Sequence, residues 1–220
     1  MIRDDIWRHS FFDGQEHLNP LTGYDERNIE WFHKTIMPKW MQLKDVGMWD
    51  AHSKVLDVGC AYGYYTKEYA KLLKPPGDIL GIDYSGLRVE SAIGLNLSFE
   101  SEVKPKYKVI DLAVECEYLP ADTFDIAVTS AVFQHIDPDK REIGFKHIAQ
   151  ALKPGGKFVL FDSITFTDQL WDGFFSKLSL SFLDSLWKKN IFTKSSYPIT
   201  NVGEGLPGEV VSMIILEKPS

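Results

Sequence analysis

The fold of this chain is decided by one stretch, VLDVGCAYGYYT at residues 55–66. A short apolar run carries the acid Asp57 near its end, and two glycines four positions apart follow it, with two small residues and one aromatic residue between them. Tyr65, Tyr69 and Leu72 then recur at helical spacing, so the pattern predicts a buried strand, a tight turn and an amphipathic helix. Glycine permits positive φ and close approach of another molecule, and a helix start offers unpaired N–H groups to an anion. The stretch therefore predicts a cofactor cradle.

The residues of the turn separate two kinds of cofactor. A dinucleotide fingerprint, G-x-G-x-x-G, needs glycine where this chain has Ala61 and Tyr64. The stretch resembles instead the first motif of the class I S-adenosylmethionine (SAM) methyltransferases, acid-x-Gly-x-Gly-x-Gly, and departs from it only by the methyl group of Ala61. In that family the turn receives the methionine end of SAM and the acid organises the ammonium. The resemblance implies cofactor contacts from Asp57, Gly59, Cys60, Ala61 and Gly63. The alternative is a glycine turn that only packs a strand on a helix.

Two later acids extend the resemblance. Residues 78–83 (DILGID) read as a second strand, and a carboxylate at its end can accept both hydroxyls of a ribose. The family uses the acid at this place for the ribose of SAM, which implies that role for Asp83, with Tyr84 packing on the adenine; a solvated loop aspartate is the alternative. A third strand at residues 107–111 would bring Asp111 and the N–H of Leu112 to the adenine. Glu115 is the competing choice for this contact.

The next motifs resemble the second half of the same family. Residues 124–130 (FDIAVTS) read as a central strand, because they are β-branched and almost wholly apolar. FQHI at 133–136, LKPGG at 152–156 and the strand KFVLFD at 157–162 follow in the family's order, so the resemblance covers about residues 54–163. It implies an α/β, Rossmann-like, doubly wound sheet of seven strands, mostly parallel with one antiparallel strand near the C-terminal edge. It also implies a cofactor contact at Ser130.

The segments on either side are predicted to close the site. Residues 1–50 read as a helical N-terminal cap or lid, and residues 51–220 as the SAM-binding domain. A helix is expected from Asp25, ended or kinked by Pro38. Tyr24 and Trp31 of the cap are candidate substrate-binding residues, since a sulfonium favours aromatic faces. The apolar stripe at 165–190 is predicted to be a sheet-covering helix, with a pocket wall or a dimer contact as alternatives.

The chemistry follows from the predicted cofactor, because SAM carries an activated methyl group on its sulfonium. If the acceptor is a hydroxyl or ammonium, a base must take its proton. His135, just past the fourth strand, and Asp162, at the end of the fifth, are the candidate catalytic residues. His135 has the alternative of only shaping the cofactor pocket, as in the family, and Asp162 that of capping a helix. No metal is expected.

Composition limits the partners. A net charge of −7 and a pI near 5.4 argue against a broad phosphate-binding surface, so nucleic acid is an unlikely partner. No apolar run is long enough for a membrane span, and the acids and arginines of residues 1–20 leave no signal-peptide core. Cys60 and Cys116 have no metal-ligand spacing, so reduced thiols and a cytoplasmic location are expected, with the protein a monomer or homodimer.

Three functions remain open. The first is methyl transfer from SAM to an oxygen or nitrogen of a small acceptor such as a metabolite, natural product or sugar. The second is a tRNA or protein methyltransferase, for which the basic run at residues 104–108 is the feature in favour. The third is a SAM-binding protein without methyl transfer, because a cradle predicts only binding. A nicotinamide dehydrogenase is a distant fourth.

Overall fold

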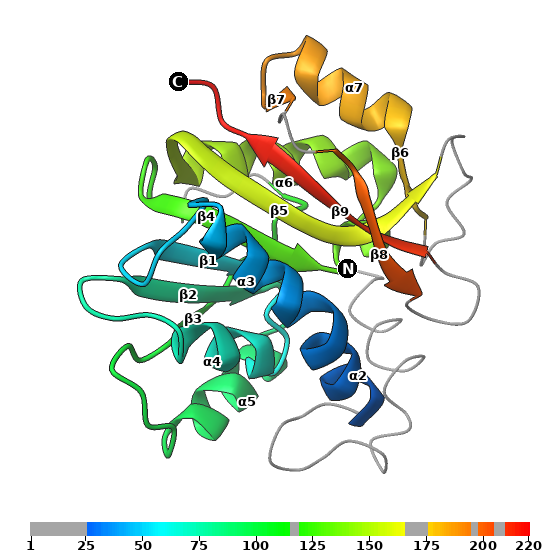
Figure 1. The fold of residues 1–220 in the computed structure, drawn as a ribbon. Helices are drawn as coiled ribbons and strands as arrows, with labels where there is room; N and C mark the ends of the chain where they lie inside the picture. Colours follow the sequence, from blue (N-terminus) through cyan, green and yellow to red (C-terminus); the bar gives the residue numbers. More distant parts are fainter. Residues whose placement is uncertain (1–25, 115–118, 166–175, 195–197, 205–209) are drawn as a thin grey trace.

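The structure is a computed structural model that describes residues 26–114, 119–165, 176–194, 198–204 and 210–220. Its centre is a sheet with helices on both faces (Figure 1). The continuous path of this sheet has the order β3-β2-β1-β4-β5-β9-β7. Those strands are β1 (Lys54–Val58), β2 (Asp78–Asp83), β3 (Lys106–Val109), β4 (Phe124–Ser130), β5 (Leu152–Thr165), β7 (Thr193–Lys194) and β9 (Val210–Glu217). Two short strands lie off the path: β6 (Leu178–Ser179) pairs with β5, and β8 (Thr200–Glu204) with β9.

The strand directions match the prediction. β1 to β5 pair in parallel, whereas β9 is antiparallel to its three partners β5, β7 and β8. β9 is therefore the one strand on the path that runs against the others. The chain starts in the middle of the sheet, builds outward to β3 and then returns to β4 on the other side of β1. Open α/β sheets bind ligands at such a reversal, beyond the carboxyl ends of the strands.

Alternate side chains of the strands pack into two separate hydrophobic cores, one on each face of the sheet. On one face, Leu56 and Val58 of β1 join a cluster that includes Phe145 of α6 (Pro138–Ala151) and Leu183 of α7 (Leu180–Lys188). On the other face, Val55 joins a cluster with side chains of the N-terminal helices and of α4 (Tyr64–Ala70). Because both faces are covered, the central strands are apolar almost throughout, as the sequence of β4 predicts.

The N-terminal helical run crosses the second face of the sheet (Figure 1). It consists of α2 (Glu26–Trp31), a π-helical turn η2 (Phe32–Ile36) and α3 (Met37–Asp45). Pro38 occupies the first turn of α3 and does not end the run; the switch to π hydrogen bonding lies just before it, with the Met37 N–H donating to the Phe32 carbonyl. A missing N–H and a ring clash at Pro38 are reasons for this interruption. A chain division near residue 50 stays a prediction.

Particular contacts mark several element boundaries, and two of these boundaries differ from the expected ranges. α5 (Gly86–Asn96) stops at Asn96, whose side-chain Nδ2 donates to the Pro105 carbonyl at 3.2 Å. The third strand covers residues 106–109, so Asp111 lies two residues past its end. Within the stripe at 165–190, residues 166–175 lie outside the described residues and α7 begins only at Leu180. Its N-cap Ser179 fixes this start, because the Ser179 hydroxyl accepts the Phe182 N–H at 3.2 Å.

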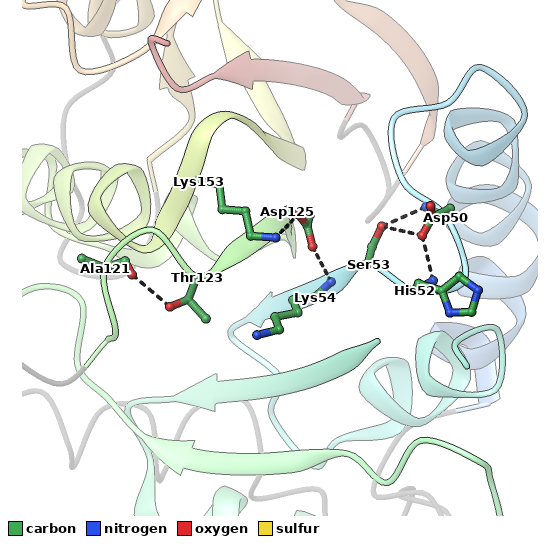
Figure 2. Close-up of polar contacts among 8 residues, drawn as sticks. All are labelled: Asp50, His52, Ser53, Lys54, Ala121, Thr123, Asp125 and Lys153. Carbon is green, nitrogen blue, oxygen red and sulfur yellow. Dashed lines mark hydrogen bonds and ion pairs between the residues drawn. The ribbon is translucent and has the colours of Figure 1, made fainter. Parts of the chain in front are cut away.

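The amino ends of the central strands are joined by Asp125 of β4 (Figure 2). One carboxylate oxygen accepts the Lys54 N–H at the start of β1 at 2.7 Å, and the other pairs with the Lys153 ammonium of β5 at 2.5 Å. Beside it, Asp50 accepts the His52 N–H at 2.7 Å in the turn that leads into β1. Asp125 thus ties β1 and β5 to the strand between them.

We predict that Asp125→Ala lowers the free energy of unfolding by about 1–2 kcal/mol, because a charge-assisted bond to a backbone N–H is lost together with a partly exposed ion pair. Urea denaturation measures the change. Asp184→Ala, which removes the same charge from the exposed face of α7, is the matched control and is expected to stay within about 0.5 kcal/mol of the wild type. Equal effects of the two substitutions would contradict the role of Asp125.

Candidate functional site

The bend between β1 and α4 has left-handed backbone at three alternate positions. Gly59, Ala61 and Gly63 have φ values of +75°, +46° and +77°. A Cβ at Gly59 would lie 2.2 Å from Cγ2 of Val132, and one at Gly63 would lie 2.6 Å from the hydroxyl of Tyr107. Both glycines are therefore required by packing as well as by φ. Ala61 adopts the same kind of conformation with a side chain, which costs about 1–2 kcal/mol relative to a right-handed residue.

Hydrogen bonds hold the bend against the carboxyl end of β2. The Ile82 carbonyl accepts the N–H groups of Gly59 at 2.8 Å and Cys60 at 2.9 Å. The Asp83 carboxylate accepts the Ala61 N–H at 3.0 Å with Oδ2 and the Ser85 N–H at 2.9 Å with Oδ1. Asp83 thus lies directly at the bend, and the second strand acid and the glycine turn form one site.

Asp57 is a buried acid under this bend. The residue is 5% exposed, and its carboxylate accepts a hydrogen bond of 2.5 Å from the hydroxyl of Thr66, on α4. Burial raises the pKa of Asp57 to about 7, the Thr66 hydrogen bond opposes this rise, and the charge of Asp83 adds to it. Burial likewise raises the pKa of Asp83, with the charge of Arg88 and the two N–H donors acting against it. Two neighbouring buried carboxylates therefore make the site strongly favourable for a cation.

The side chain of Tyr107 covers the bend from β3. Its hydroxyl donates to the Gly63 carbonyl at 3.2 Å, and its ring lies where a Cβ at Gly81 would come within 2.9 Å. Burial raises the pKa of the Tyr107 hydroxyl well above its ordinary value, so the phenol stays protonated and can donate. Tyr107 is 24 residues from Asp83 in sequence. The sequence pattern predicts it only as the first residue of a strand and not as a residue of the site.

The residues predicted on the adenine side differ in exposure. Tyr84 is half-buried just past β2. Asp111 is exposed, and its Oδ1 accepts the Ala113 N–H at 2.8 Å. The side chain of Leu112 is buried in the core that contains Phe145. The competing residue Glu115 lies outside the described residues, so the choice between Asp111 and Glu115 stays open.

The candidate catalytic residues lie around the turn after β4. Ser130 ends β4, and a 3-10 turn, η3 (Phe133–His135), follows it. His135 is half-buried, with its Nε2 3.3 Å from Nε2 of Gln134. Asp162 of β5 is fully buried; its Oδ2 accepts the Phe133 N–H at 3.0 Å and its Oδ1 the Ser163 N–H at 2.9 Å. This geometry favours the capping alternative for Asp162, since both oxygens serve main-chain N–H groups.

The aromatic residues predicted in the cap are described only in part. Tyr24 lies outside the described residues, as does Cys116. Trp31 ends α2 and is half-buried against the core on the second face. Its indole Nε1 is buried and makes no hydrogen bond within the described part of the chain. The Cys60 thiol is buried, and burial raises its pKa.

Three residues of the site were missed by sequence reasoning: Thr66, Tyr107 and Val132. Thr66 alone had a usable signal, because a hydroxyl on the buried face of the helix nine residues after a buried acid is a candidate partner for it. Val132 and Tyr107 meet the glycines from segments far along the chain, and neither residue belongs to a recognisable motif.

The strand order reverses at β1, where a left-handed bend lies beside acids at the ends of adjacent strands. These features define a doubly wound α/β domain of the nucleotide-binding class. Residues 56–158 match the model of the family described as methyltransferase domain. This matched segment is similar to a methyltransferase domain, in agreement with the resemblance to the class I S-adenosylmethionine-dependent methyltransferases that the motifs carry.

Sequence comparison finds relatives of this segment, and structure comparison shows its fold in other proteins. The carboxy-S-adenosyl-L-methionine synthase of Aeromonas salmonicida is 28% identical over 134 residues, 59% of this chain and 51% of that protein. The chain thus spans about half the length of the curated relatives it matches. The 1,6-didemethyltoxoflavin-N1-methyltransferase of Burkholderia thailandensis has the same fold, with a TM-score of 0.68, 17% identity and coverage of 100% of this chain and 88% of that one. Magnesium protoporphyrin IX methyltransferase from Synechocystis also has this fold, with a TM-score of 0.64 and 15% identity. The alignment covers 99% of this chain and 91% of that one.

Two further findings concern the described residues only. They contain no group of three or more His, Cys, Asp or Glu side chains arranged to hold a metal ion. Within the same residues, every helix is too short or too polar to cross a bilayer.

We predict that Ala61→Gly raises the free energy of unfolding by about 0.5–1 kcal/mol, because glycine relieves the left-handed strain and loses part of this gain to its greater freedom in the unfolded chain. The contrasting control is Ala92→Gly in the buried face of α5, where glycine is expected to destabilise by about 1 kcal/mol or more. Both changes are read from urea denaturation midpoints. Destabilisation by both substitutions would contradict the strain at residue 61.

We predict that Asp57→Asn flattens the pH dependence of stability. Because the folded-state pKa of Asp57 is raised from 3.8 to about 7, the folded protein binds more protons than the unfolded chain between these values, and its stability falls as pH rises through them. The fall corresponds to on the order of 4 kcal/mol for this group. Denaturation at a series of pH values should show it in the wild type and in Asp184→Asn, and not in Asp57→Asn. Parallel profiles for all three proteins would refute the assignment.

Proposed function

We propose that this protein binds SAM at the bend and transfers its methyl group to an oxygen or nitrogen of a small-molecule acceptor. The observation that carries the proposal is the Asp57 carboxylate, which is buried beneath the bend with a hydroxyl and without a cation among its described partners. A buried carboxylate without a cation is unstable in its charged form. The ammonium of the methionine end is the group that would compensate it, so the donor set fits this cofactor.

The neighbouring residues fit the nucleoside part. Asp83 would hold the ribose hydroxyls, since each carboxylate oxygen accepts one N–H and retains a further lone pair. Gly59, Cys60, Ala61 and Gly63 would supply main-chain contacts to the methionine end. Tyr84, Ser130, and Asp111 or Glu115 with Leu112 stay predictions for the remaining cofactor contacts.

When bound, SAM would supply an electrophilic methyl group, and the protein's task is then to orient an acceptor and to hold its proton. His135 is the residue that would accept the proton of the acceptor, because it ends a turn that is anchored at Phe133 by buried Asp162. Asp162 then acts by fixing the turn that carries His135. Trp31 and Tyr24 stay candidates for the acceptor side.

The alternatives are weighed by particular observations. A SAM-using enzyme other than a methyltransferase is supported by the relatives named as carboxy-S-adenosyl-L-methionine synthases. Against an RNA acceptor, two lysines of the basic run have partners: Lys106 pairs with Asp78 at 2.5 Å, and the Lys104 ammonium donates to the Phe99 carbonyl. A cytoplasmic location and a monomer or homodimer remain part of the proposal.

The binding step is tested by calorimetric titration with S-adenosylhomocysteine. Loss of the Asp83 charge in Asp83→Asn is expected to weaken binding about 10- to 100-fold, as for a charge-assisted hydrogen-bonded group. Asp78→Asn removes the same charge from the amino end of the same strand and is expected to leave the affinity within about twofold of the wild type. No binding by the wild type, or an equal loss in both variants, would overturn the proposed site.

The transfer step needs a separate experiment. Metabolite extracts are incubated with the protein and SAM, and mass spectrometry is used to find compounds that gain one methyl group. Accumulation of S-adenosylhomocysteine with a methylated product supports methyl transfer. Conversion of SAM itself into a modified SAM, without a methylated product, supports the third function instead.

A further inference from the structure

A cavity lies apart from the bend, where two helices begin. It has a volume of about 200 Å³ and is bordered by Pro138 and Arg141 of α6, by Lys177, and by Ser179, Ser181 and Phe182 at the start of α7. Both helices lie against the core on the first face of the sheet, and Figure 1 shows α7 and β6 at the same side of the molecule as the end of β5. The cavity therefore lies on the carboxyl side of β5.

The charges around this cavity are of one sign. Arg141 and Lys177 border it, and the described residues that line it include no carboxylate. This is unusual for a chain with a net charge of −7. Asp162 and Asp137 are the carboxylates whose charges act on Arg141, and neither lines the cavity. A cationic pocket in an acidic protein favours a negatively charged ligand.

Arg141 is held rigidly at the wall of the cavity. The residue is 3% exposed, and its guanidinium donates to the carbonyls of Gln134, Ile136, Ser176 and Lys177. A guanidinium has five N–H donors, and these bonds use four of them. One N–H of Nη1 is left without an acceptor in the described part of the chain, and the Lys177 ammonium makes no hydrogen bond or ion pair there.

The helix starts add to this positive field. Pro138 is in the first turn of α6, Ser179 is the N-cap of α7, and Ser181 lies in the first turn of α7. The N-terminus of a helix carries a partial positive charge and unpaired N–H groups, so two helices of 14 and 9 residues direct their favourable ends at one small space. The carboxylates of Asp137 and Asp139 offset part of this effect at α6.

The cavity shares a wall with the predicted acceptor side. The Ser176 N–H donates to the Gln134 carbonyl at 2.8 Å, and Gln134 precedes His135 in the η3 turn. The volume corresponds to about six or seven water molecules, less than the roughly 300 Å³ of a complete small-molecule site. It is large enough for one acidic end of a ligand.

We propose that this cavity binds the oxyanion of the methyl acceptor, a carboxylate or a phosphate group, so that the acceptor is an acidic small molecule. The claim that the anion belongs to a methyl acceptor rests on the proposed function. The claim that the cavity binds an anion rests on the cavity alone. Arg141 and Lys177 bind the anion beside the hydroxyls of Ser179 and Ser181, which lie 2.8 Å apart and hydrogen-bond to each other.

The anion site is tested by thermal unfolding of the full chain with sodium malonate or sodium phosphate, each compared with sodium chloride at equal ionic strength. The wild type should show a saturable rise in Tm with at least one of the two anions, and the anion that binds more tightly identifies the acidic group. Lys177→Gln should weaken this binding about tenfold through loss of one charge-assisted contact. Lys188→Gln, at the exposed far end of α7, should bind like the wild type.

No rise beyond the chloride reference, or an equal response of Lys177→Gln and Lys188→Gln, would overturn the anion site. The acceptor part is read from metabolite extracts divided by anion exchange: methylated products are expected in the retained, acidic fraction, and products confined to the unretained fraction would contradict an acidic acceptor. S-adenosylhomocysteine binding is measured on the same three proteins. If the wild type does not bind S-adenosylhomocysteine, the proposed function is refuted. The anion site is then judged from the Tm measurements alone.

Discussion

The hydrogen bonds from the bend to the end of β2 are the constraint on which the site depends. Ile82 accepts two N–H groups of the bend with one carbonyl, and Asp83 accepts a third with its carboxylate. These bonds hold left-handed residues at 59, 61 and 63 beside the acid, so strand pairing in the sheet places the turn. Without the β1–β2 register, in which Val58 lies opposite Ile82, neither acceptor would reach the bend.

The same region lowers the stability of the unliganded protein. Asp57 and Asp83 are buried acids with raised pKa values, and Ala61 is an alanine in the conformation that glycine prefers. Such features are retained where function needs them, and the two apolar cores on either side of the sheet offset their cost. A cationic ligand would relieve the Asp57 charge, so binding and stability are coupled at this residue.

The other half of the molecule is organised by buried polar groups of a different kind. Asp162 caps the η3 turn from β5, and Arg141 joins that turn to residues 176 and 177 through main-chain carbonyls. These hydrogen bonds therefore connect four elements into one wall: β5, the η3 turn, α6 and the start of α7. The proposed anion cavity lies in this wall, whereas the cofactor bend lies at β1 and β2, so the two ligands would be held by separate parts of one sheet.

The doubly wound strand order and the single antiparallel strand were implied by the resemblance to a known family, whereas the residues by themselves indicated the position of the bend and the two acids beside it. The bend and the acids could be found because apolar runs, glycine spacing and a residue at a strand end can be read from neighbours along the chain. The tertiary structure decided that Thr66 binds Asp57, that Tyr107 and Val132 exclude side chains at Gly63 and Gly59, that Asp162 faces a main-chain N–H, and that Arg141 and Lys177 border one cavity. Apart from Thr66, each of these contacts joins residues more than 20 positions apart, and such contacts depend on how helices pack across the sheet, which no pattern in a single segment encodes.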